Sequence, residues 1–182
     1  MNFSLVRPAE ELGQQFMNMA DEFRMAGEAH YLDEDILSQG LSKYLEWLRN
    51  GEVAENLPPN LVPWTAYWAM SDTRLVGFSS LRHWLSPWMA EFGGHIGYRV
   101  RPSARRFGLG THLLRLTLSK AFERGINPAL IVCTPENTAS VATIKKNGGI
   151  YDRETERDDG VRLHRFWVST SAVSSNLDST DA

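Results

Sequence analysis

The stretch VRPSARRFGLG, residues 100–110, is the most informative part of this chain, because it joins a predicted strand over 93–100 to a predicted helix that begins at Thr111. Gly108 and Gly110 let the backbone approach a ligand closely and adopt positive φ angles. The unpaired N–H groups of the first helical turn, with the positive end of the helix dipole, attract an anion. Arg105 and Arg106 add positive charge. The sequence therefore predicts a phosphate-binding loop.

Two common kinds of glycine-rich phosphate loop do not match this stretch. A Walker A loop ends in Gly-Lys-Ser/Thr, whereas Gly110 is followed by Thr111 and His112. A dinucleotide-binding fingerprint needs a glycine or alanine three residues after Gly110, where this chain has Leu113. That fingerprint also follows the first strand of its domain, whereas here nearly a hundred residues precede the loop.

A third kind of loop does match. The pattern Arg-x-x-Gly-x-Gly over 105–110, with Val-x-Pro over 100–102, resembles the acyl-CoA-binding signature of the GNAT superfamily of N-acetyltransferases. A second matching block, NTAS over 137–140, follows an apolar strand and opens a helix that ends at KNGG, residues 146–149. The resemblance covers about residues 75–150. The run GGHIGY, residues 93–98, is also similar to a subgroup of predicted bacterial acetyltransferases.

The resemblance implies where acyl-CoA would bind. The pantetheine would pair with Tyr98 and Val100 like an added strand, and a backbone N–H near Val100 would polarise the thioester carbonyl. Asn137 would reach the ligand from the opposite wall, although it also suits a plain helix N-cap. The residues expected to contact acyl-CoA are Tyr98, Arg99, Val100, Arg105, Arg106, Phe107, Gly108, Leu109, Gly110, Thr111, Asn137 and Ser140.

The groups that move protons are less clear from the sequence. Glu91 and His95 are candidate bases near the strand that ends at Val100, and His83 is a more distant one. Strict alternation places His95 on the opposite face from Val100, and a structural role for this histidine is at least as plausible. Many family members carry a tyrosine seven positions after Asn137 to protonate the leaving thiolate, and this chain has Ile144 there. The predicted catalytic set is Glu91, His95 and Asn137.

Composition limits the class of protein. The formal net charge is −3 and no run of Lys and Arg forms a stripe, which argues against nucleic-acid binding. The single cysteine, Cys133, excludes an intramolecular disulfide and indicates a reducing compartment. Aliphatic runs are far shorter than the roughly twenty residues of a membrane span, and the N-terminus lacks a secretion signal. We expect a cytoplasmic protein with neither a membrane nor a metal among its partners.

Hydrophobic periodicity and turn residues predict a single α/β domain over 1–169, with a mixed, mostly antiparallel sheet flanked by helices. Residues 170–182 read as a disordered polar tail. The resemblance adds that the fourth and fifth strands splay apart to admit acyl-CoA. The expected strands are 3–6, 64–70, 75–82, 93–100, 129–133, 150–156 and 161–168, the expected helices are 8–27, 36–49, 111–124 and 139–147, and 84–91 is expected to be a loop over the cleft.

The resulting hypothesis is an N-acetyltransferase that moves an acetyl group from acetyl-CoA directly to an amine in a ternary complex. The acceptor is open among small molecules and peptides, and homodimers are common in the family. Two alternatives stay open. One is a non-catalytic acyl-CoA-binding or regulatory module on the same fold, which Ile144 in place of tyrosine would suit. The other is a different nucleotide-binding protein that uses the same loop.

Overall fold

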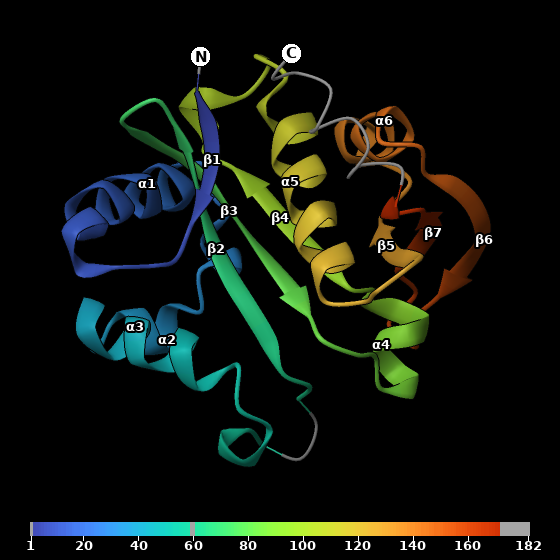
Figure 1. The fold of residues 1–182 in the computed structure, drawn as a ribbon, viewed down its shortest axis with the longest axis horizontal. Helices are drawn as coiled ribbons and strands as arrows, with labels where there is room; N and C mark the ends of the chain where they lie inside the picture. The colour runs from blue at the N-terminus through green and yellow to red at the C-terminus, as the bar shows by residue number, and fades with distance from the viewer. Residues whose placement is uncertain (1, 59–60, 172–182) are drawn as a thin grey trace.

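The structure is a computed structural model that describes residues 2–58 and 61–171. Two antiparallel sheets form its centre, and helices cover them (Figure 1). The first sheet has the order β1-β2-β3-β4 and consists of β1 (Phe3–Val6), β2 (Trp64–Ser71), β3 (Arg74–Arg82) and β4 (Ile96–Val100). The second has the order β5-β7-β6 and consists of β5 (Ala129–Cys133), β6 (Ile150–Glu156) and β7 (Arg162–Val168).

Helices cover both faces of the first sheet. They are α1 (Gly13–Met25), α2 (Glu34–Leu37), α3 (Leu41–Asn50), α4 (Pro87–Phe92), α5 (Leu109–Glu123) and α6 (Thr138–Lys146). The helices α1, α2 and α3 lie on one face and α5 on the other, while α6 packs against α5 and β5. Neighbouring residues of β2 show the two faces: Trp68 packs into the cluster formed by α1, α2 and α3, whereas Ala69 packs against α5. Because side chains alternate along a strand, one hairpin supports a separate apolar cluster on each face.

The two sheets meet at one point beside β4 and β5. The backbone N–H of His95 donates to the carbonyl of Leu130 over 2.7 Å, and the N–H of Leu130 donates to the Nδ1 atom of His95 over 2.9 Å. The two strands then belong to different sheets. The predicted splay is therefore present, and it begins directly after His95.

Several element boundaries differ from the sequence-based expectation. Much of the loop expected over 84–91 lies in the short helix α4, because Ser86 caps this helix by accepting a hydrogen bond from the N–H of Met89 and Pro87 suits its first turn. The helix expected from Thr111 begins at Leu109, and the helix expected from Pro8 begins at Gly13 after a 3-10 turn.

The C-terminal part of the described chain is anchored beyond the expected domain end. Thr170 is fully buried, and its N–H and hydroxyl donate to the side-chain oxygen of Asn127 and the carbonyl of Ile126. Ordered packing thus continues past residue 169. From residue 172 onward, the polar tail expected over 170–182 lies outside the described residues.

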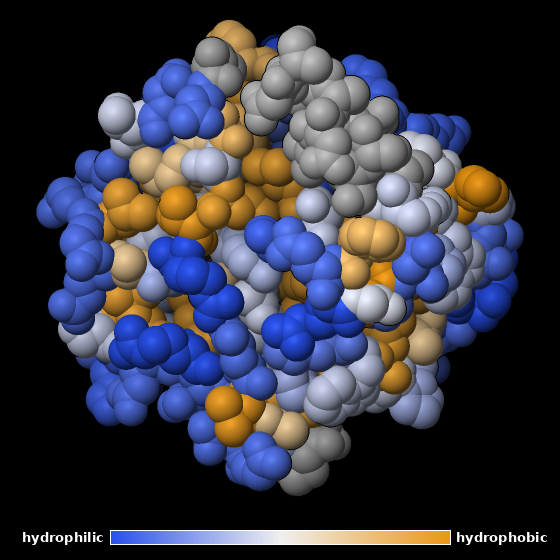
Figure 2. All heavy atoms as spheres, viewed as in Figure 1, coloured by the Kyte–Doolittle hydropathy of each residue, from blue (hydrophilic) through white to orange (hydrophobic). Residues whose placement is uncertain are grey.

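The surface is a mosaic of hydrophilic and hydrophobic side chains on the face seen in Figure 2. The helices within the described residues are all too short or too polar to cross a lipid bilayer.

Candidate functional site

A cavity of about 610 Å³ opens in the splay between β4 and β5. The edge of β4, the loop after it, the first turn of α5 and one face of α6 form its walls. Eleven of the twelve residues expected to contact acyl-CoA line it, and the exception is Phe107, whose side chain is 73% exposed. Residues that the sequence did not single out also line it, namely Glu28, Ala104, Ala139, Ala142, Thr143 and Lys146.

The loop before α5 has the backbone geometry of an anion site. Gly108 has φ 76° and caps α5, and Arg106 has φ 70°, an uncommon angle for a residue with a side chain. Positive φ angles turn successive N–H groups toward one side, which creates a concave site for an anion. Leu109 and Gly110, in the first turn of α5, line the cavity and lie at the positive end of the helix dipole. This is where a pyrophosphate would fit.

Arg105 has a protein partner as well as a place in the loop. Its guanidinium binds both carboxylate oxygens of Glu28, over 2.8 and 2.6 Å, and its Nε donates to the carbonyl of Val100. Glu28 lies 77 positions away in the sequence, so no local pattern could indicate this pairing. Arg105 thereby ties the segment after α1 to the loop, and its neighbour Arg106 is a second exposed cation of the loop.

The edge of β4 that faces the cavity pairs with no further strand among the described residues. The N–H of Arg101 donates to Val76 on β3, so the alternating backbone groups of Tyr98 and Val100 face the other way. Consistently, the carbonyl of Tyr98 accepts from the side chain of Arg99, and that of Val100 accepts from Arg105. An extended ligand could therefore add to β4 at Tyr98 and Val100.

The opposite wall is α6. The side chain of Asn137 caps this helix by accepting a hydrogen bond from the N–H of Ser140, so the N-cap interpretation is realised within the cavity wall. Ser140 and Thr143 lie one turn apart on the face that lines the cavity. Ile144 is completely buried and packs in the core, so its position does not face the cavity at all.

Tyr98 crosses the cleft to α6. Its hydroxyl lies 2.9 Å from the Oγ atom of Ser140. Burial raises the pKa of Tyr98, while hydrogen bonds to Ser140 and Thr143 oppose that shift. The phenol is therefore a protonated group at neutral pH, held between the two walls of the splay. Tyr98 and Arg99 line both this cavity and a second one.

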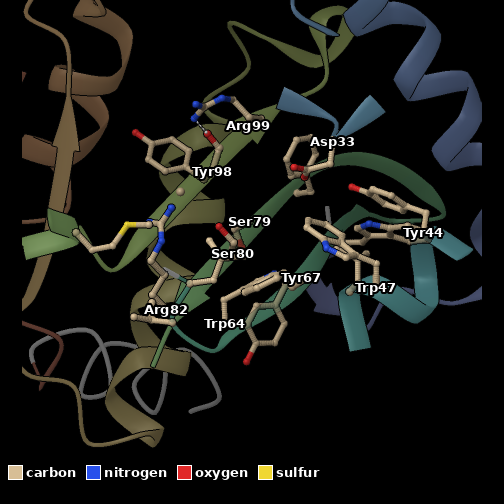
Figure 3. A pocket seen from close by; sticks show the side chains of 18 residues that line it. Asp33, Tyr44, Trp47, Trp64, Tyr67, Ser79, Ser80, Arg82, Tyr98 and Arg99 are labelled. Carbon is tan, nitrogen blue, oxygen red and sulfur yellow. Dashed lines mark hydrogen bonds between the residues drawn. The ribbon is translucent and has the colours of Figure 1, made fainter. Parts of the chain in front are cut away.

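The second cavity, of about 340 Å³, lies on the face of the first sheet that α1, α2 and α3 cover. Figure 3 shows Tyr44 and Trp47 of α3 on one side of it and Arg82 and Arg99, from β3 and β4, on the other, with Trp64 and Tyr67 of β2 beside Arg82. Most of its wall is apolar, and its charged lining residues are Asp33, Arg82 and Arg99. The sequence predicts that Trp47 and Trp64 lie in the core or line a cleft and that residues 30–56 help to shape the acceptor pocket, but it assigns no role to Arg82, whose place in the cavity depends on elements distant in the chain.

Glu91 lines neither cavity. Its carboxylate accepts hydrogen bonds from Thr155 at 2.8 Å and from Arg153 and Arg165, each at 2.7 Å. The bond from Thr155, followed by that from Arg153, lowers the pKa of Glu91. A carboxylate with these partners is a poor proton acceptor, so the geometry argues against the role of base and indicates that Glu91 anchors α4 to the second sheet.

His95 and His83 also lie outside both cavities. The Nδ1 atom of His95 is occupied by the N–H of Leu130, and burial, followed by the charge of Arg82, lowers the pKa of His95 to about 4. His83 lies 2.9 Å from the hydroxyl of Thr65, and burial lowers its pKa as well. The contacts of His95 favour the structural alternative that the sequence left open.

The depressed pKa of His95 predicts a pH-dependent stability. Below about pH 6.5, the ordinary pKa of histidine, His95 is protonated in the unfolded state, whereas in the folded state it stays neutral down to about pH 4. Stability from this residue is therefore complete above pH 6.5 and falls with decreasing pH, by about 2 kcal/mol between pH 7 and 5. Urea unfolding at both pH values, for wild type and for His95→Asn, should show a smaller loss in the variant. Equal losses would contradict the assignment.

Comparisons with known proteins agree with this geometry. Residues 18–149 match the sequence model of the acetyltransferase (GNAT) family. No curated protein sequence matches this chain significantly. Solved structures share its fold at low identity. They include yncA from Salmonella typhimurium with its cofactor acetyl-CoA, which is 12% identical at a TM-score of 0.62, with 92% of this chain and 94% of that chain covered.

Two further solved structures have named acceptors. One is the aminoglycoside acetyltransferase AAC(6')-Ib in complex with coenzyme A and kanamycin, which is 15% identical at a TM-score of 0.63, covering 96% of this chain and 98% of that chain. The other is a chimera of spermidine N-acetyltransferase SpeG from Vibrio cholerae and hSSAT, which is 12% identical at a TM-score of 0.62, covering 96% and 99%.

Proposed function

This chain belongs to the GNAT family of acetyltransferases, and we propose that it transfers an acetyl group from acetyl-CoA directly to the amine of an acceptor bound beside it. The observation that carries the proposal is that Tyr98 and Arg99 of β4 line both cavities. One cavity has a phosphate-type loop and an open strand edge, and the other is largely apolar. A donor and an acceptor held in these two cavities would meet at β4.

The donor would lie along β4. Its pyrophosphate would bind the N–H groups at the start of α5, and its pantetheine would pair with the open backbone groups of Tyr98 and Val100. The N–H of Val100 would then donate to the thioester oxygen as negative charge develops there. Each of these groups is a backbone atom, which explains why varied side chains can serve at these positions.

Tyr98 is the group that we assign to the leaving thiolate. In the transfer, the amine nitrogen bonds to the thioester carbon and the carbon–sulfur bond breaks. The thiolate takes the hydroxyl proton of Tyr98, and the phenolate regains a proton that the acceptor nitrogen releases through solvent. The products are the N-acetyl amine and the CoA thiol. The raised pKa of Tyr98 keeps the proton available at neutral pH.

Cys133 does not suit an acyl-enzyme route. Its side chain is almost fully buried at the end of β5, and burial raises the pKa of its thiol. Because the thiolate is the reactive form, this environment disfavours acyl transfer through Cys133. Direct transfer needs no covalent intermediate, so Cys133→Ser should retain activity.

The test combines acetyl-CoA binding with thiol release. Saturating acetyl-CoA should stabilise the protein against unfolding, by about 2.7 kcal/mol at a hundred times its Kd, and purified protein should release CoA thiol in the presence of a suitable amine. Ala142→Trp should abolish both effects, because Ala142 is an exposed residue of α6 that lines the donor cavity.

Lys145→Trp is the matched control, at an exposed position of the same helix outside the residues that line the cavity. If Ala142→Trp still binds acetyl-CoA as tightly as Lys145→Trp does, the donor site is wrongly placed. Stabilisation by acetyl-CoA without thiol release from any amine would favour the non-catalytic binding module. Stabilisation by ATP and not by acetyl-CoA would favour a nucleotide-binding protein.

A further inference from the structure

The second cavity, which would hold the acceptor and is called the acceptor cavity below, is lined by an arginine, Arg82, whose charge no carboxylate among the described residues neutralises. Arg82, the last residue of β3, donates from its Nη1 atom to the carbonyls of Gly93 and Gly94, over 3.3 and 2.8 Å. Within residues 2–58 and 61–171, no carboxylate forms an ion pair with Arg82. Burial, followed by the charge of Arg99, lowers the pKa of Arg82. A largely buried cation beside another cation is an unfavourable arrangement that an anion would relieve.

The guanidinium of Arg82 also has the geometry for an anion. An arginine has five N–H donors in a planar fork, and the two carbonyls account for bonds from Nη1 only. Arg82 lines the acceptor cavity, and Figure 3 shows its guanidinium turned toward Tyr98, which also lines the donor cavity. A carboxylate is a ligand that such a fork binds through two parallel hydrogen bonds.

The rest of the cavity is suited to an apolar group. Aromatic and aliphatic side chains form much of the remaining wall. Trp47 lies on the far side from the two arginines, whereas Trp64, the cross-strand partner of Arg82, lies beside Arg82 together with Tyr67 (Figure 3). Asp33 is the acidic lining residue, and it lies near Tyr44 on the far side. Burial raises the pKa of Asp33, which weakens its attraction for a cation.

We infer that the acceptor is an amino acid, with its carboxylate on Arg82, its α-amino group beside Tyr98 and an apolar side chain against the aromatic wall. This inference rests on the proposed function and names the substrate class of the same site. A polycation would meet two arginines and a single carboxylate in this cavity, so it is a poor fit. The volume of about 340 Å³ is near the lower limit for small-molecule pockets, which suits a compact acceptor.

The positive charges also favour the reactive form of the amine. A like charge nearby lowers the pKa of an ammonium group, because it disfavours the charged form. In the bound acceptor, Arg82 would offset the negative charge of the carboxylate, which otherwise holds the proton on the α-amino group, and Arg99 would add a positive charge nearby, so both would help this group to lose its proton to solvent. This effect accounts for an acceptor site in which neither Glu91 nor His95 lines the cavity.

The experiment compares amines that differ only in the carboxylate. Thiol release from acetyl-CoA is measured with phenylalanine, tryptophan and leucine and with phenethylamine, tryptamine and isoamylamine, and spermidine and kanamycin serve as polycations. We expect kcat/KM for at least one amino acid to exceed that of its decarboxylated partner by about 10- to 100-fold, the range for a lost hydrogen bond to a charged group. Equal values, or a preference for polycations, overturn the inference and leave the acetyltransferase function standing.

Variants assign the preference to Arg82. Arg82→Gln should reduce the ratio between an amino acid and its decarboxylated partner toward one while retaining turnover of the latter, and Arg82→Lys should keep part of the preference. Arg124→Gln, at an exposed position at the end of α5, is the control and should leave the ratio unchanged. A ratio that Arg82→Gln does not change overturns the assignment, whatever its effect on stability, because misfolding lowers both rates together.

A binding measurement separates this inference from the proposed function. Calorimetric titration of the protein with the same six compounds, with CoA present, needs no turnover. Binding of an amino acid, with loss of affinity in Arg82→Gln and in the decarboxylated amine, supports the inference even if no thiol is released. If no amino acid binds and none is acetylated, the inference is wrong.

Discussion

Tyr98→Phe should lower kcat for acetyl transfer by about 100-fold, at the lower end of the range for general acid catalysis, while the Kd for acetyl-CoA changes by only a few-fold. The variant removes the hydroxyl that lies 2.9 Å from Ser140 and leaves the ring that packs between the two apolar clusters. A loss of kcat at the lower end of this range is expected, because a thiolate whose thiol has a pKa of about 8.5 is a good leaving group even without a proton donor.

The pH profile distinguishes a proton donor from a packing residue. Because the pKa of Tyr98 is raised, the wild type should keep its donor protonated, and its kcat should not fall, up to about pH 10. Steady-state thiol release across this range measures both quantities. Tyr151→Phe is the control, because Tyr151 is an exposed tyrosine on β6. An unchanged kcat in Tyr98→Phe would mean that water protonates the thiolate.

Gly94→Ala should destabilise the fold by about 2–5 kcal/mol, combining the strain of a left-handed residue with overpacking. Gly94 has φ 68°, and a Cβ atom there would lie 2.7 Å from the carbonyl oxygen of Leu130. That oxygen is backbone and accepts the hydrogen bond from His95, so it cannot move aside without disturbing the junction of the two sheets. The acetyl-CoA affinity should fall too, because the splay begins at this contact.

Gly125→Ala is the matched control for backbone strain alone. Gly125 has a similar φ of 78°, and nothing lies within 4 Å of the position of its Cβ atom. Its cost should be about 1–2 kcal/mol, the penalty of the left-handed conformation. Urea unfolding of both variants measures the difference. Equal losses would show that the close approach of Gly94 to Leu130 carries no energetic weight.

The order of the elements and the donor site could be predicted from local sequence patterns. Apolar runs of strand length, helical periodicity and turn glycines are read within a few neighbouring residues, so β5 and the hairpin of β2 and β3 were located almost correctly. The phosphate-type loop is equally local, because the strand end, Gly108 and the start of α5 are consecutive. Hydrophobic periodicity did not predict the helix α4, because this short helix is started by a single side-chain cap, Ser86, and has no periodic pattern.

The proton-transfer groups could not be assigned in this way. Glu91 carries the chemistry of a base, but partners at positions 153, 155 and 165 occupy its carboxylate. His95 has the pKa range of a base as a free residue, but the N–H of Leu130 occupies its Nδ1 atom and burial lowers its pKa to about 4, which disfavours that role. Counting seven residues from Asn137 led to Ile144, which points into the core, while Tyr98 reaches the same region from the opposite wall.

The element order, the anion-binding loop and the likeness to the GNAT family follow from local sequence, because backbone preferences and glycine placement act over short distances. Which side chains face a cavity, and with what net charge, follows only from the folded arrangement of distant segments. Arg82 illustrates the reason. Its proposed role in binding a carboxylate depends on the aromatic residues of α3 and β2 that line the same cavity, on Arg99 on the next strand, and on the absence of a carboxylate partner among the described residues. The burial and the net charge of a site depend on many residues that are far apart in the sequence and close together in the fold.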